Sequence, residues 1–593
     1  MALQQMNKSG GYEHTDQFLP VTREEMDRLG WDRADIILVT GDAYVDHPAF
    51  GTAVMARLAE HQGMRVAVLP QPNWRDDLRD LKKLGTPRLF FGVTAGAMDS
   101  MVNHYTARRR RRSNDAYTPG GRTGYRPDMP SIVYTRILKQ LYPETPVLLG
   151  GVEASMRRFS HYDYWEDKLR PGILLESGAD ILLYGMAEQP FIRIIELMDR
   201  GVPIQSLHNI LQTAFLTGLN DKLPELKGYS FTRLPSHEEC LADKGVFAGA
   251  FRLMDEASNS WQPGRLLQAH GDRLLVVNPP YPPPAKAEAD RPYDLPYTRL
   301  PHPKYRKKPP IPAWEMIRFS VNTHRGCFGG CSFCAIAAHQ GKFVVSRSEA
   351  SIMRELEAVS KMPGFRGHVS DLGGPTANMY RMGGHNPDVC KACRRPSCLH
   401  PGICKNLNYD HHPLIRLYDM ALKVEGIKRI TIGSGVRHDM LVKRPAGDVK
   451  RYGLDHYTRR LLTHHVSGRL KLAPEHTEQA VLHKMRKPSF DKFALFYSRF
   501  KEICRKENLP WQMVPYLVSG HPGSTDQDMQ AMAKVLRRMG LRPEQIQEFT
   551  PTPMTLATTM YYTGIDPYSG EKLHITRTDR AKKKQKQTIL QGR

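Results

Sequence analysis

The sequence predicts an α/β protein built from two successive arrays of alternating strands and helices. Short β-branched apolar runs alternate with amphipathic stretches from about residue 34, the alternation stops in a proline-rich segment, and it then resumes. With 593 residues, 40% of them hydrophobic, the chain can form more than one domain. We therefore expect an N-terminal doubly wound parallel sheet followed by a partial (β/α)6 barrel.

The first array begins with a βαβ unit. A strand at 35–41 and a helix at 52–63, closed by Gly63, precede a second strand at 65–70. Further strands are expected at 88–94, 146–150 and 180–185, with helices before Tyr142 and after Ala187. A long polar insertion, residues 98–130, interrupts this array and is expected to be a surface loop. The array predicts a Rossmann-like domain over residues 21–278, preceded by a flexible N-terminus at 1–20.

The segment 279–312 contains twelve prolines in 34 residues, with lysine and arginine interleaved. Such a composition disfavours both long helices and regular sheets, so we expect an extended linker that can follow the next domain. The second domain is assigned to residues 313–576, with a cysteine-rich insertion at 381–412. The lysine-rich residues 577–593 are expected to form a basic disordered tail.

Six strand candidates make up the second array. They lie at residues 316–322, 367–373, 428–433, 469–474, 512–519 and 545–550. The helices that accompany them are expected at 348–361, 413–424, 479–485, 491–507 and 526–539. Ligand-binding groups of such a barrel belong at the carboxyl ends of its strands.

Three cysteines, Cys327, Cys331 and Cys334, directly follow the first of these six strands with C-x3-C-x2-C spacing. Three thiolates hold three irons of a cubane cluster and leave the fourth iron open to a small molecule. A structural zinc site is the alternative, with His324 or His339 as its fourth ligand. The position after a barrel strand favours the cluster.

Polar groups also follow the second and third strands. Gly373 and Gly374 offer exposed backbone to the amino and carboxylate ends of a ligand. Ser434 and Arg437 place a hydroxyl and a guanidinium at the mouth of the same pocket, where Arg437 can pair with a carboxylate. Glu475, His476 and His521 lie at later strand ends and carry little weight as acid–base candidates.

A second group, Cys390, Cys393, Cys398 and Cys404, has C-x2-C-x4-C-x5-C spacing. Four thiolates close a coordination shell, so the group predicts either structural zinc or a second iron–sulfur cluster, and the sequence does not separate the two. Seven of the nine cysteines lie between 327 and 404, which favours metal ligation over a disulfide framework. Cys240 and Cys504 are expected to be ordinary buried thiols.

The charge balance is strongly basic, with 85 lysines and arginines against 61 acidic residues. This excess favours contact with phosphates or nucleic acid, although the run from Arg108 to Arg112 is best interpreted as a solvated loop. The sequence contains no long apolar span and no apolar signal core, which predicts a cytoplasmic protein without membrane contact.

The chain resembles the YgiQ family of radical S-adenosylmethionine (SAM) proteins over its whole length. The resemblance is carried by N-T-H-R-G-C-F-G-G-C-S-F-C at 322–334, D-L-G-G-P-T-A-N at 371–378, I-G-S-G-V-R-H-D at 432–439 and L-K-L-A-P-E-H-T-E-Q at 470–479. It implies a 4Fe-4S cluster on Cys327, Cys331 and Cys334, with SAM bound through its amino and carboxylate groups to the open iron. Gly373 and Gly374 would then contact the SAM amino group, Arg437 its carboxylate, and Phe333 its adenine. Pro375 stands where the family's motif has an acidic residue.

This resemblance implies an enzyme that reductively cleaves SAM to methionine and a 5′-deoxyadenosyl radical, which acts on an unknown substrate. A reducing electron donor of flavodoxin or ferredoxin type is implied as a partner. The alternatives are an RNA-modifying radical SAM enzyme, such as a tRNA methylthiotransferase, and a non-enzymatic metal-stapled RNA-binding protein.

The N-terminal domain is similar to cobalamin-binding modules. Their axial-ligand pattern D-x-H-x-x-G is matched by His47 alone, since Val45 and Phe50 occupy the outer positions. We therefore expect the fold of such a module, and we favour a domain that shapes the substrate tunnel over one that binds cobalamin.

Overall fold

The computed structural model describes residues 17–442, 446–544 and 546–590, and the chain divides into two compact units. The first unit runs to Ala242 and adds Gln262–Pro282 and Arg291–Arg318; the second comprises Asp243–Trp261, Pro283–Asp290 and the chain from Phe319 onward. Of the flexible N-terminus expected at 1–20, residues 1–16 lie outside the described residues. Phe18 and Leu19 are buried, because the chain has already joined the first unit there.

A nine-stranded sheet forms the centre of the first unit, with the order β10-β11-β12-β9-β8-β5-β4-β1-β3. Its strands are β1 (Ile36–Thr40), β3 (Val66–Pro70), β4 (Phe90–Thr94), β5 (Val147–Gly150), β8 (Ile181–Leu183), β9 (Thr213–Gly218), β10 (Phe231–Arg233), β11 (Arg265–His270) and β12 (Arg273–Val277). The five strands β3, β1, β4, β5 and β8 are parallel and correspond to the predicted strands. Their order is that of a doubly wound fold whose switch point lies between β1 and β4.

The predicted doubly wound parallel sheet is confirmed, and antiparallel strands that were not predicted extend it. β9 pairs antiparallel with β8 and β12, and β12 pairs antiparallel with β11. The β11–β12 hairpin turns at Gly271, whose φ of 57° suits glycine. In the sequence, two apolar runs flank Gly271 and Asp272, a pattern that indicates a hairpin. The sequence analysis did not assign strands to these two runs.

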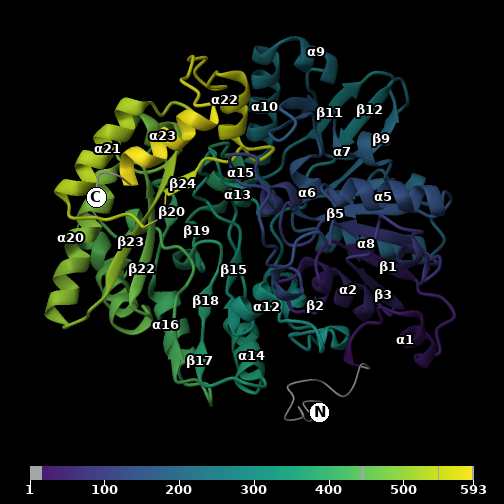
Figure 1. The fold of residues 1–593 in the computed structure, drawn as a ribbon, viewed down its shortest axis with the longest axis horizontal. Helices are drawn as coiled ribbons and strands as arrows, with labels where there is room; N and C mark the ends of the chain where they lie inside the picture. The colour runs from purple at the N-terminus through teal and green to yellow at the C-terminus, as the bar shows by residue number, and fades with distance from the viewer. Residues whose placement is uncertain (1–16, 443–445, 545, 591–593) are drawn as a thin grey trace. The chain divides into compact units, whose positions relative to one another are not determined.

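Helices cover the sheet of the first unit. They are α1 (Arg23–Arg28), α2 (Gly51–His61), α3 (Arg79–Lys82), α4 (Ser100–His104), α5 (Pro130–Leu141), α6 (Gly151–Met156), α7 (Ile173–Ser177), α8 (Glu188–Asp199), α9 (His237–Ala242) and α12 (Pro312–Ile317). α2 packs against β1, β3 and α8, whereas α5 packs against β4, β5 and α7 (Figure 1). Short strands β2 (Val45–Asp46), β6 (His161–Asp163), β7 (Lys168–Arg170) and β13 (Leu300–Pro301) complete the unit.

Two segments expected to lie outside the domain cores are built into the structure. In the insertion at 98–130, Arg109 to Arg112 are exposed as expected, but Asp115, Thr118 and Arg126 are buried. In the proline-rich segment, β13 pairs antiparallel with β2, and the Tyr305 hydroxyl accepts a hydrogen bond from the amide of Tyr44 at 3.0 Å. Buried polar partners and a strand pairing therefore hold segments whose composition indicates loops.

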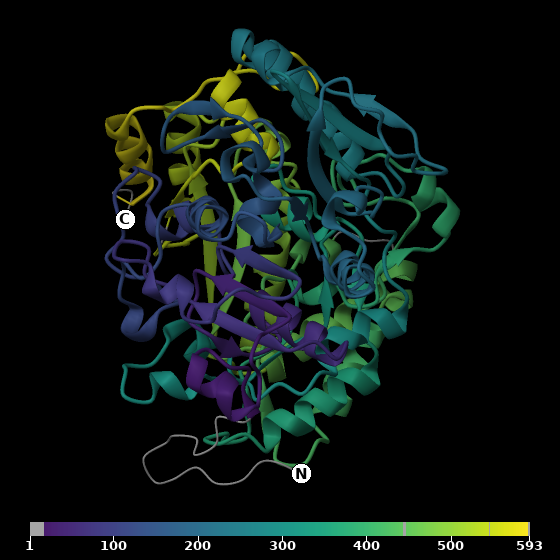
Figure 2. The same ribbon diagram turned by 90° about the vertical axis from the view of Figure 1, so that its right-hand side faces the viewer.

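The second unit contains six strand positions in the predicted order. They are β14 (Ser320–Asn322), the interrupted strand β17 (His368–Val369) and β18 (Asp371–Gly373), β21 (Arg429–Ile430), β22 (Arg469–Glu475), β23 (Gln512–Ser519) and β24 (Ile546–Glu548). All recorded pairings among them are parallel: β14 with β18, β17 with β21, β22 with β23, and β23 with β24. Figure 2 shows the long strands β22 and β23 running alongside each other. These parallel strands and the helices between them form a partial (β/α)6 barrel.

Helices of the second unit follow the strands. They are α10 (Lys244–Ser258), α11 (Lys286–Asp290), α13 (Ala335–Gln340), α14 (Glu349–Ser360), α15 (Pro387–Ala392), α16 (His412–Ala421), α17 (Ala446–Arg451), α18 (Leu454–Arg460), α19 (Gln479–Lys484), α20 (Phe490–Lys506), α21 (Asp526–Arg538), α22 (Leu556–Thr563) and α23 (Asp579–Leu590). Short strands β15 (His324–Arg325), β16 (Val345–Ser346), β19 (Gly383–Gly384) and β20 (Leu407–Asn408) flank the cysteine groups. Among the described residues, no helix is long and apolar enough to cross a membrane.

The end of the described chain corrects another expectation. Residues 577–593 were expected to be disordered, but α23 covers most of them. Lys582, Gln585 and Ile589 share one helix face and are buried, and the Gln585 side chain accepts a hydrogen bond from the amide of Gly520 at 3.0 Å. Composition alone suggested solvation, whereas the spacing of these three residues provides a packing face.

Residues 316–319 likewise differ from the expected strand, since α12 extends to Ile317.

Candidate functional site

The three-cysteine loop lies between β15 and α13, directly after β14. Cys327 donates its amide to the Gly341 carbonyl at 3.1 Å, and Cys334 donates to the Cys331 carbonyl at 3.2 Å. Gly326 has a φ of 81°, and a Cβ there would lie 2.3 Å from the Phe343 carbonyl oxygen. The loop therefore folds so tightly that only glycine fits at this position.

Residues that follow two other strands approach the loop. The Thr376 hydroxyl, after β18, lies 3.4 Å from Cys327 Sγ, and Arg437 Nη1, after β21, lies 3.8 Å from Cys331 Sγ. Three strand ends of the second unit thus meet at the thiols, as expected for a site built on barrel strand ends.

Arg437 is held by a neighbour that the sequence analysis did not identify. Its Nε and Nη2 each donate to Asp439 at 2.8 Å, and both side chains are buried. Two nitrogens of the guanidinium are therefore already bound, and the third faces the cysteine loop. That Arg437 pairs with a ligand carboxylate stays a prediction, and it now concerns the Nη1 nitrogen alone.

A second cation, Lys487, is buried on the same side of the unit. Its Nζ lies 3.5 Å from the Glu475 carboxylate, at the end of β22. Glu475 has a φ of 68°, a strained value for a residue with a side chain, which is frequent at functional sites. The sequence analysis gave Glu475 little weight as an acid–base candidate. It did not single out Lys487, which lies beyond the strand ends.

Burial and the neighbouring cations act in opposite directions on the pKa values of the loop thiols. Burial raises the pKa of Cys334 to about 12 and also raises that of Cys327. The charge of Lys487 acts against this increase at Cys334, and that of Arg437 does so at Cys327. A metal displaces the thiol protons, and the two cations then balance the negative thiolates.

No group of three or more His, Cys, Asp and Glu side chains within the described residues is arranged to hold a single metal ion. A cubane cluster does not need such an arrangement, because each of its thiolates binds a different iron. The donor set of three thiols, with a hydroxyl and a guanidinium beside them, therefore fits a 4Fe-4S cluster.

The two glycines after β18 lie close to other parts of the site. A Cβ on Gly373 would lie 2.7 Å from Ser434 Oγ, and one on Gly374 would lie 2.6 Å from the His324 ring. Asp371 accepts hydrogen bonds from the amide of Gly433 and from the Ser434 amide and hydroxyl. Burial raises the pKa of Asp371, another polar residue that the sequence analysis did not single out.

Two buried histidines, His476 and His521, follow the ends of β22 and β23, and Phe333 contacts one of them. The Phe333 ring packs edge-on to His521 at 6.0 Å, and His521 Nε2 lies 3.2 Å from Ser332 Oγ. Burial lowers the pKa of His521 to about 3 and that of His476 to about 4, so both rings are neutral near pH 7. His476 Nε2 lies 3.4 Å from the Ser524 hydroxyl, which is a structural contact.

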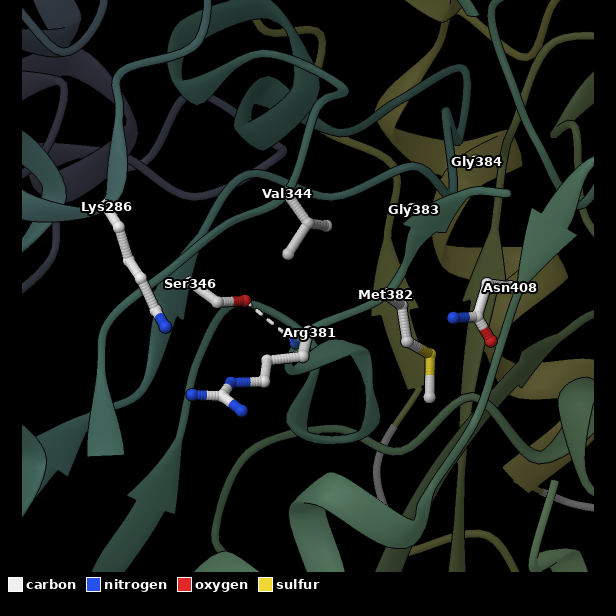
Figure 3. A pocket seen from close by; sticks show the side chains of 8 residues that line it. All are labelled: Lys286, Val344, Ser346, Arg381, Met382, Gly383, Gly384 and Asn408. Atoms are coloured by element: carbon white, nitrogen blue, oxygen red, sulfur yellow. Dashed lines mark hydrogen bonds between the residues drawn. The ribbon is translucent and has the colours of Figure 1, made fainter. Parts of the chain in front are cut away.

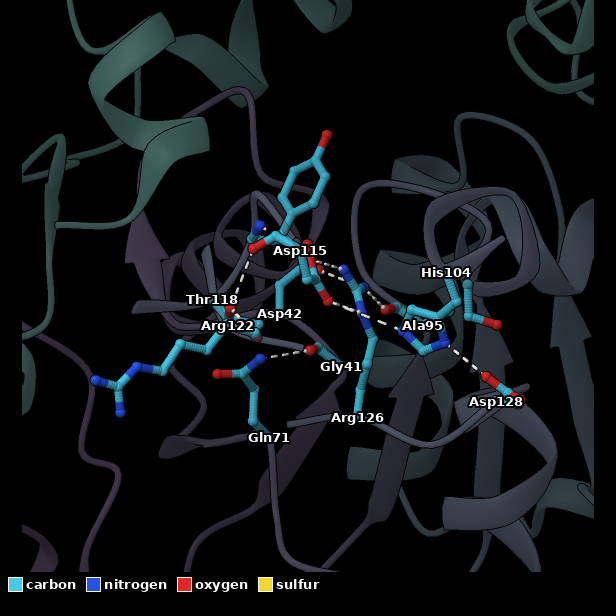
Figure 4. A network of polar contacts seen from close by, with 12 residues as sticks. Gly41, Asp42, Gln71, Ala95, His104, Asp115, Thr118, Arg122, Arg126 and Asp128 are labelled. Atoms are coloured by element: carbon cyan, nitrogen blue, oxygen red, sulfur yellow. Dashed lines mark hydrogen bonds and ion pairs between the residues drawn. The ribbon is translucent and has the colours of Figure 1, made fainter. Parts of the chain in front are cut away.

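At the switch point of the first unit, the chain's own side chains fill the strand ends (Figure 4). Arg126 donates to Asp42 at 2.7 Å, to Asp115 at 2.7 and 2.9 Å, and to the Ala95 carbonyl at 2.9 Å. His47, the expected axial ligand, is buried and accepts a hydrogen bond from the amide of Ala49 through Nδ1. Side chains of the described part of the chain therefore occupy the edge at which such a module would hold cobalamin.

The second cysteine group lies in the insertion between β19 and β20. Beside it, a pocket of about 480 Å³ is lined by residues of the second unit: Lys286, Val344, Ser346, Arg381, Met382, Gly383, Gly384 and Asn408 (Figure 3). The Arg381 amide donates to Ser346 Oγ at 2.8 Å, and its guanidinium lies 3.2 Å from Glu349. The two cations of this pocket can hold an anionic group.

Comparisons with known proteins identify the family. Residues 18–320 match the family described as Radical SAM N-terminal, and residues 544–591 match a domain of unknown function, DUF3362. The chain is 55% identical to a UPF0313 protein of Porphyromonas gingivalis over 93% of this chain and 87% of that protein. It is 52% identical to a UPF0313 protein of Bacteroides thetaiotaomicron over 97% of this chain and 94% of that protein.

Among solved structures, the chain is similar to the radical SAM methyltransferase TsrM from Kitasatospora setae with cobalamin and a 4Fe-4S cluster bound. The TM-score is 0.47 at 13% identity, covering 88% of this chain and 77% of that one. The matches over nearly the whole chain show that this protein is a radical SAM enzyme of unknown substrate and a member of the UPF0313 family, the YgiQ family.

Proposed function

We propose that this chain binds a 4Fe-4S cluster through Cys327, Cys331 and Cys334 and reductively cleaves SAM at its open iron. The single observation that carries the proposal is the meeting of three strand ends at the thiols, with Thr376 and Arg437 in contact with sulfur atoms. When bound and reduced, the cluster supplies the electron that splits SAM into methionine and a 5′-deoxyadenosyl radical.

The chain's own residues hold and tune this site. The three thiolates ligate iron, while the Thr376 hydroxyl donates to the Cys327 sulfur and Arg437 places positive charge beside Cys331. Asp439 fixes the guanidinium by two hydrogen bonds, so its charge stays in place as the cluster changes its charge. Buried charge of this kind stabilises an added electron more than the same charge in water does.

Ligand contacts follow from the neighbouring strand ends. We assign the backbone of Gly373 and Gly374 to the SAM amino group, Ser434 and Arg437 Nη1 to its polar end, and Phe333 to its adenine. Asp371 holds the Ser434 hydroxyl and the Gly433 amide, and therefore positions this edge of the pocket. The substrate and the type of reducing partner lie beyond this assignment.

The test is the production of 5′-deoxyadenosine by anaerobically reconstituted protein with SAM and dithionite. We expect wild-type protein to produce it, and a variant carrying Cys327→Ala, Cys331→Ala and Cys334→Ala to produce none above background. A matched control is Cys504→Ala, which removes a buried thiol from α20 of the same unit and leaves the loop intact. Activity retained by the folded triple variant would contradict the proposal.

A further inference from the structure

The four-cysteine insertion, residues 385–406, is a small subdomain closed at its neck by the pairing of β19 with β20. Cys390 lies in α15, Cys393 caps the carboxyl end of that helix, and the amide of Cys404 donates to the Cys398 carbonyl at 2.8 Å. Gly384 in the neck approaches Cys390 so closely that a Cβ would lie 2.2 Å from its sulfur. The backbone thus brings all four positions together.

A buried cation and polar groups lie beside the thiols. Lys342 is buried, and its Nζ donates to the Arg395 carbonyl at 2.7 Å. The Cys390 sulfur accepts a hydrogen bond from Asn406 Nδ2, and the Cys393 sulfur accepts one from the Arg395 amide, both at 3.4 Å. Hydrogen bonds to sulfur and a nearby cation are the features that stabilise metal-bound thiolates.

Four thiolates suit either a zinc ion or a 4Fe-4S cluster. The backbone contact between the insertion and the three-cysteine loop favours the cluster. Two neighbouring iron–sulfur clusters can exchange electrons, whereas zinc has no redox chemistry.

The insertion contacts the three-cysteine loop directly. The amide of Cys398 donates to the Phe328 carbonyl at 3.0 Å, and the Ser397 hydroxyl donates to the Gly329 carbonyl at 2.7 Å. A Cβ on Gly330 would lie 2.2 Å from the Pro396 carbonyl oxygen, so the two backbones are in close contact. One backbone hydrogen bond therefore links Cys398 to Phe328, the residue that follows Cys327.

The insertion also carries solvent-exposed cations. Lys391, Arg394, Arg395 and Lys405 are all exposed. The Arg395 guanidinium donates to the uncharged His400 carbonyl at 2.9 Å. Asp388 balances the charge of Lys391 in an exposed ion pair, and the charges of Arg394, Arg395 and Lys405 keep this cationic surface positive. Such a surface attracts an acidic protein and orients it with the insertion facing the contact.

We propose that Cys390, Cys393, Cys398 and Cys404 ligate a second 4Fe-4S cluster that passes single electrons from an acidic one-electron carrier protein to the cluster on Cys327, Cys331 and Cys334. One electron leaves the reduced carrier, which is oxidised, and reduces the second cluster and then the first. No bond forms or breaks in the transfer. The metal site is independent of the proposed SAM cleavage, whereas the relay rests on it.

Metal content tests the site first. Wild-type protein reconstituted anaerobically should hold about eight irons, and the triple variant of the three-cysteine loop should keep about four, with the absorbance and electron paramagnetic resonance signal of a 4Fe-4S cluster. A variant with Cys390, Cys393, Cys398 and Cys404 all changed to Ser should also hold about four, now on the SAM site. A variant in which all seven cysteines of the two groups are changed should hold no iron.

Three results would overturn the metal site: about one equivalent of zinc in protein purified anaerobically, iron content unaffected by the four serine changes, or no metal in the triple variant. If the quadruple variant does not fold, the single variant Cys393→Ser tests the metal site instead. It removes one ligand near the surface and should make the second cluster labile to oxygen.

The relay is tested by comparing two reductants. Dithionite is small and reaches either cluster, whereas a reduced flavodoxin or ferredoxin must dock. The ratio of 5′-deoxyadenosine formation with the carrier protein to that with dithionite should fall at least tenfold in the quadruple serine variant. Changing Lys391, Arg394, Arg395 and Lys405 to Gln should lower the same ratio and weaken its salt dependence while leaving the iron content intact. Unchanged ratios in both variants would overturn the relay and leave the metal site standing.

Discussion

Both units of the molecule place charged residues at the carboxyl ends of parallel strands, but the charges are satisfied differently. In the first unit, Arg126 joins Asp42 and Asp115, and each of the three nitrogens of its guanidinium donates to a carboxylate or a carbonyl of the chain. In the second unit, Asp439 takes two nitrogens of Arg437, and the third faces the cysteine loop. A strand end can therefore be sealed or left available to a ligand by the number of partners that the fold supplies.

The largest effect is expected from opening the sealed strand ends. Arg126→Met leaves two buried carboxylates without their cation and should lower the free energy of unfolding of the first unit by about 3–5 kcal/mol. Urea titration followed by hydrogen exchange of peptides from β1 and β4 measures this loss. Arg79→Met is the control, because the Arg79–Asp77 ion pair is exposed and its loss should change stability by less than about 0.5 kcal/mol. A similar effect of both changes would remove the contrast between the two units.

Titration of the same strand ends should appear as pH dependence. Burial, opposed by Arg126 and reinforced by Asp115, raises the pKa of Asp42 from 3.8 to about 6. A carboxyl whose folded pKa is the higher one holds its proton more tightly in the folded state. Its contribution to stability is complete below about pH 4 and is lost as the pH rises through about 6, a change of about 3 kcal/mol.

Hydrogen exchange of β1 measured between pH 4 and pH 7, with correction for the intrinsic exchange rate, should therefore show falling protection. Asp42→Asn lacks the titrating group and should flatten the profile. A rise in protection over this range would contradict the pKa shift.

A glycine at the sealed end offers a smaller test. Gly96 has a φ of 110°, and a Cβ there would lie 2.2 Å from the Asp42 carboxylate. Gly96→Ala should destabilise the first unit by about 1–3 kcal/mol through overpacking, in addition to backbone strain. Gly85→Ala is the matched control, since Gly85 also has positive φ but no atom within 4 Å of the added Cβ. Equal thermal unfolding midpoints for both variants would show that the strand ends are loosely packed.

The smallest expected effect concerns the available strand end. Thr376→Val removes the hydroxyl beside the Cys327 sulfur, a hydrogen bond worth about 1 kcal/mol. Because the hydroxyl stabilises negative charge on sulfur, the midpoint potential of the cluster should become more negative. Redox titration monitored by electron paramagnetic resonance measures the shift, with Thr458→Val, a buried hydroxyl bonded within α18, as the control. A shift to more positive potential would contradict the assigned contact.

Much of the second unit could be predicted because its signals are local. Residues 469–474 and 512–519 alternate as strands do, and β22 and β23 occupy nearly the same bounds. Cys327, Cys331 and Cys334 lie within eight residues, so chain connectivity alone keeps them close. The antiparallel extension of the first sheet, by contrast, depends on β9 pairing with β12, whose paired residues lie 55 to 63 positions apart in the chain, and no local pattern indicates that pairing.

The sequence by itself determined where the thiols, the glycines and most strands lie, because spacing and periodicity act over a few residues. Only the tertiary structure decided which charges meet. Asp371 and Thr376 gained their roles from partners that follow other strands, Lys487 gained its role from Glu475 at the end of β22, and Arg126 lies far along the chain from Asp42, which it neutralises. The physical reason is desolvation: a buried charge must find its counter-charge wherever the fold places one, and sequence distance does not limit that choice.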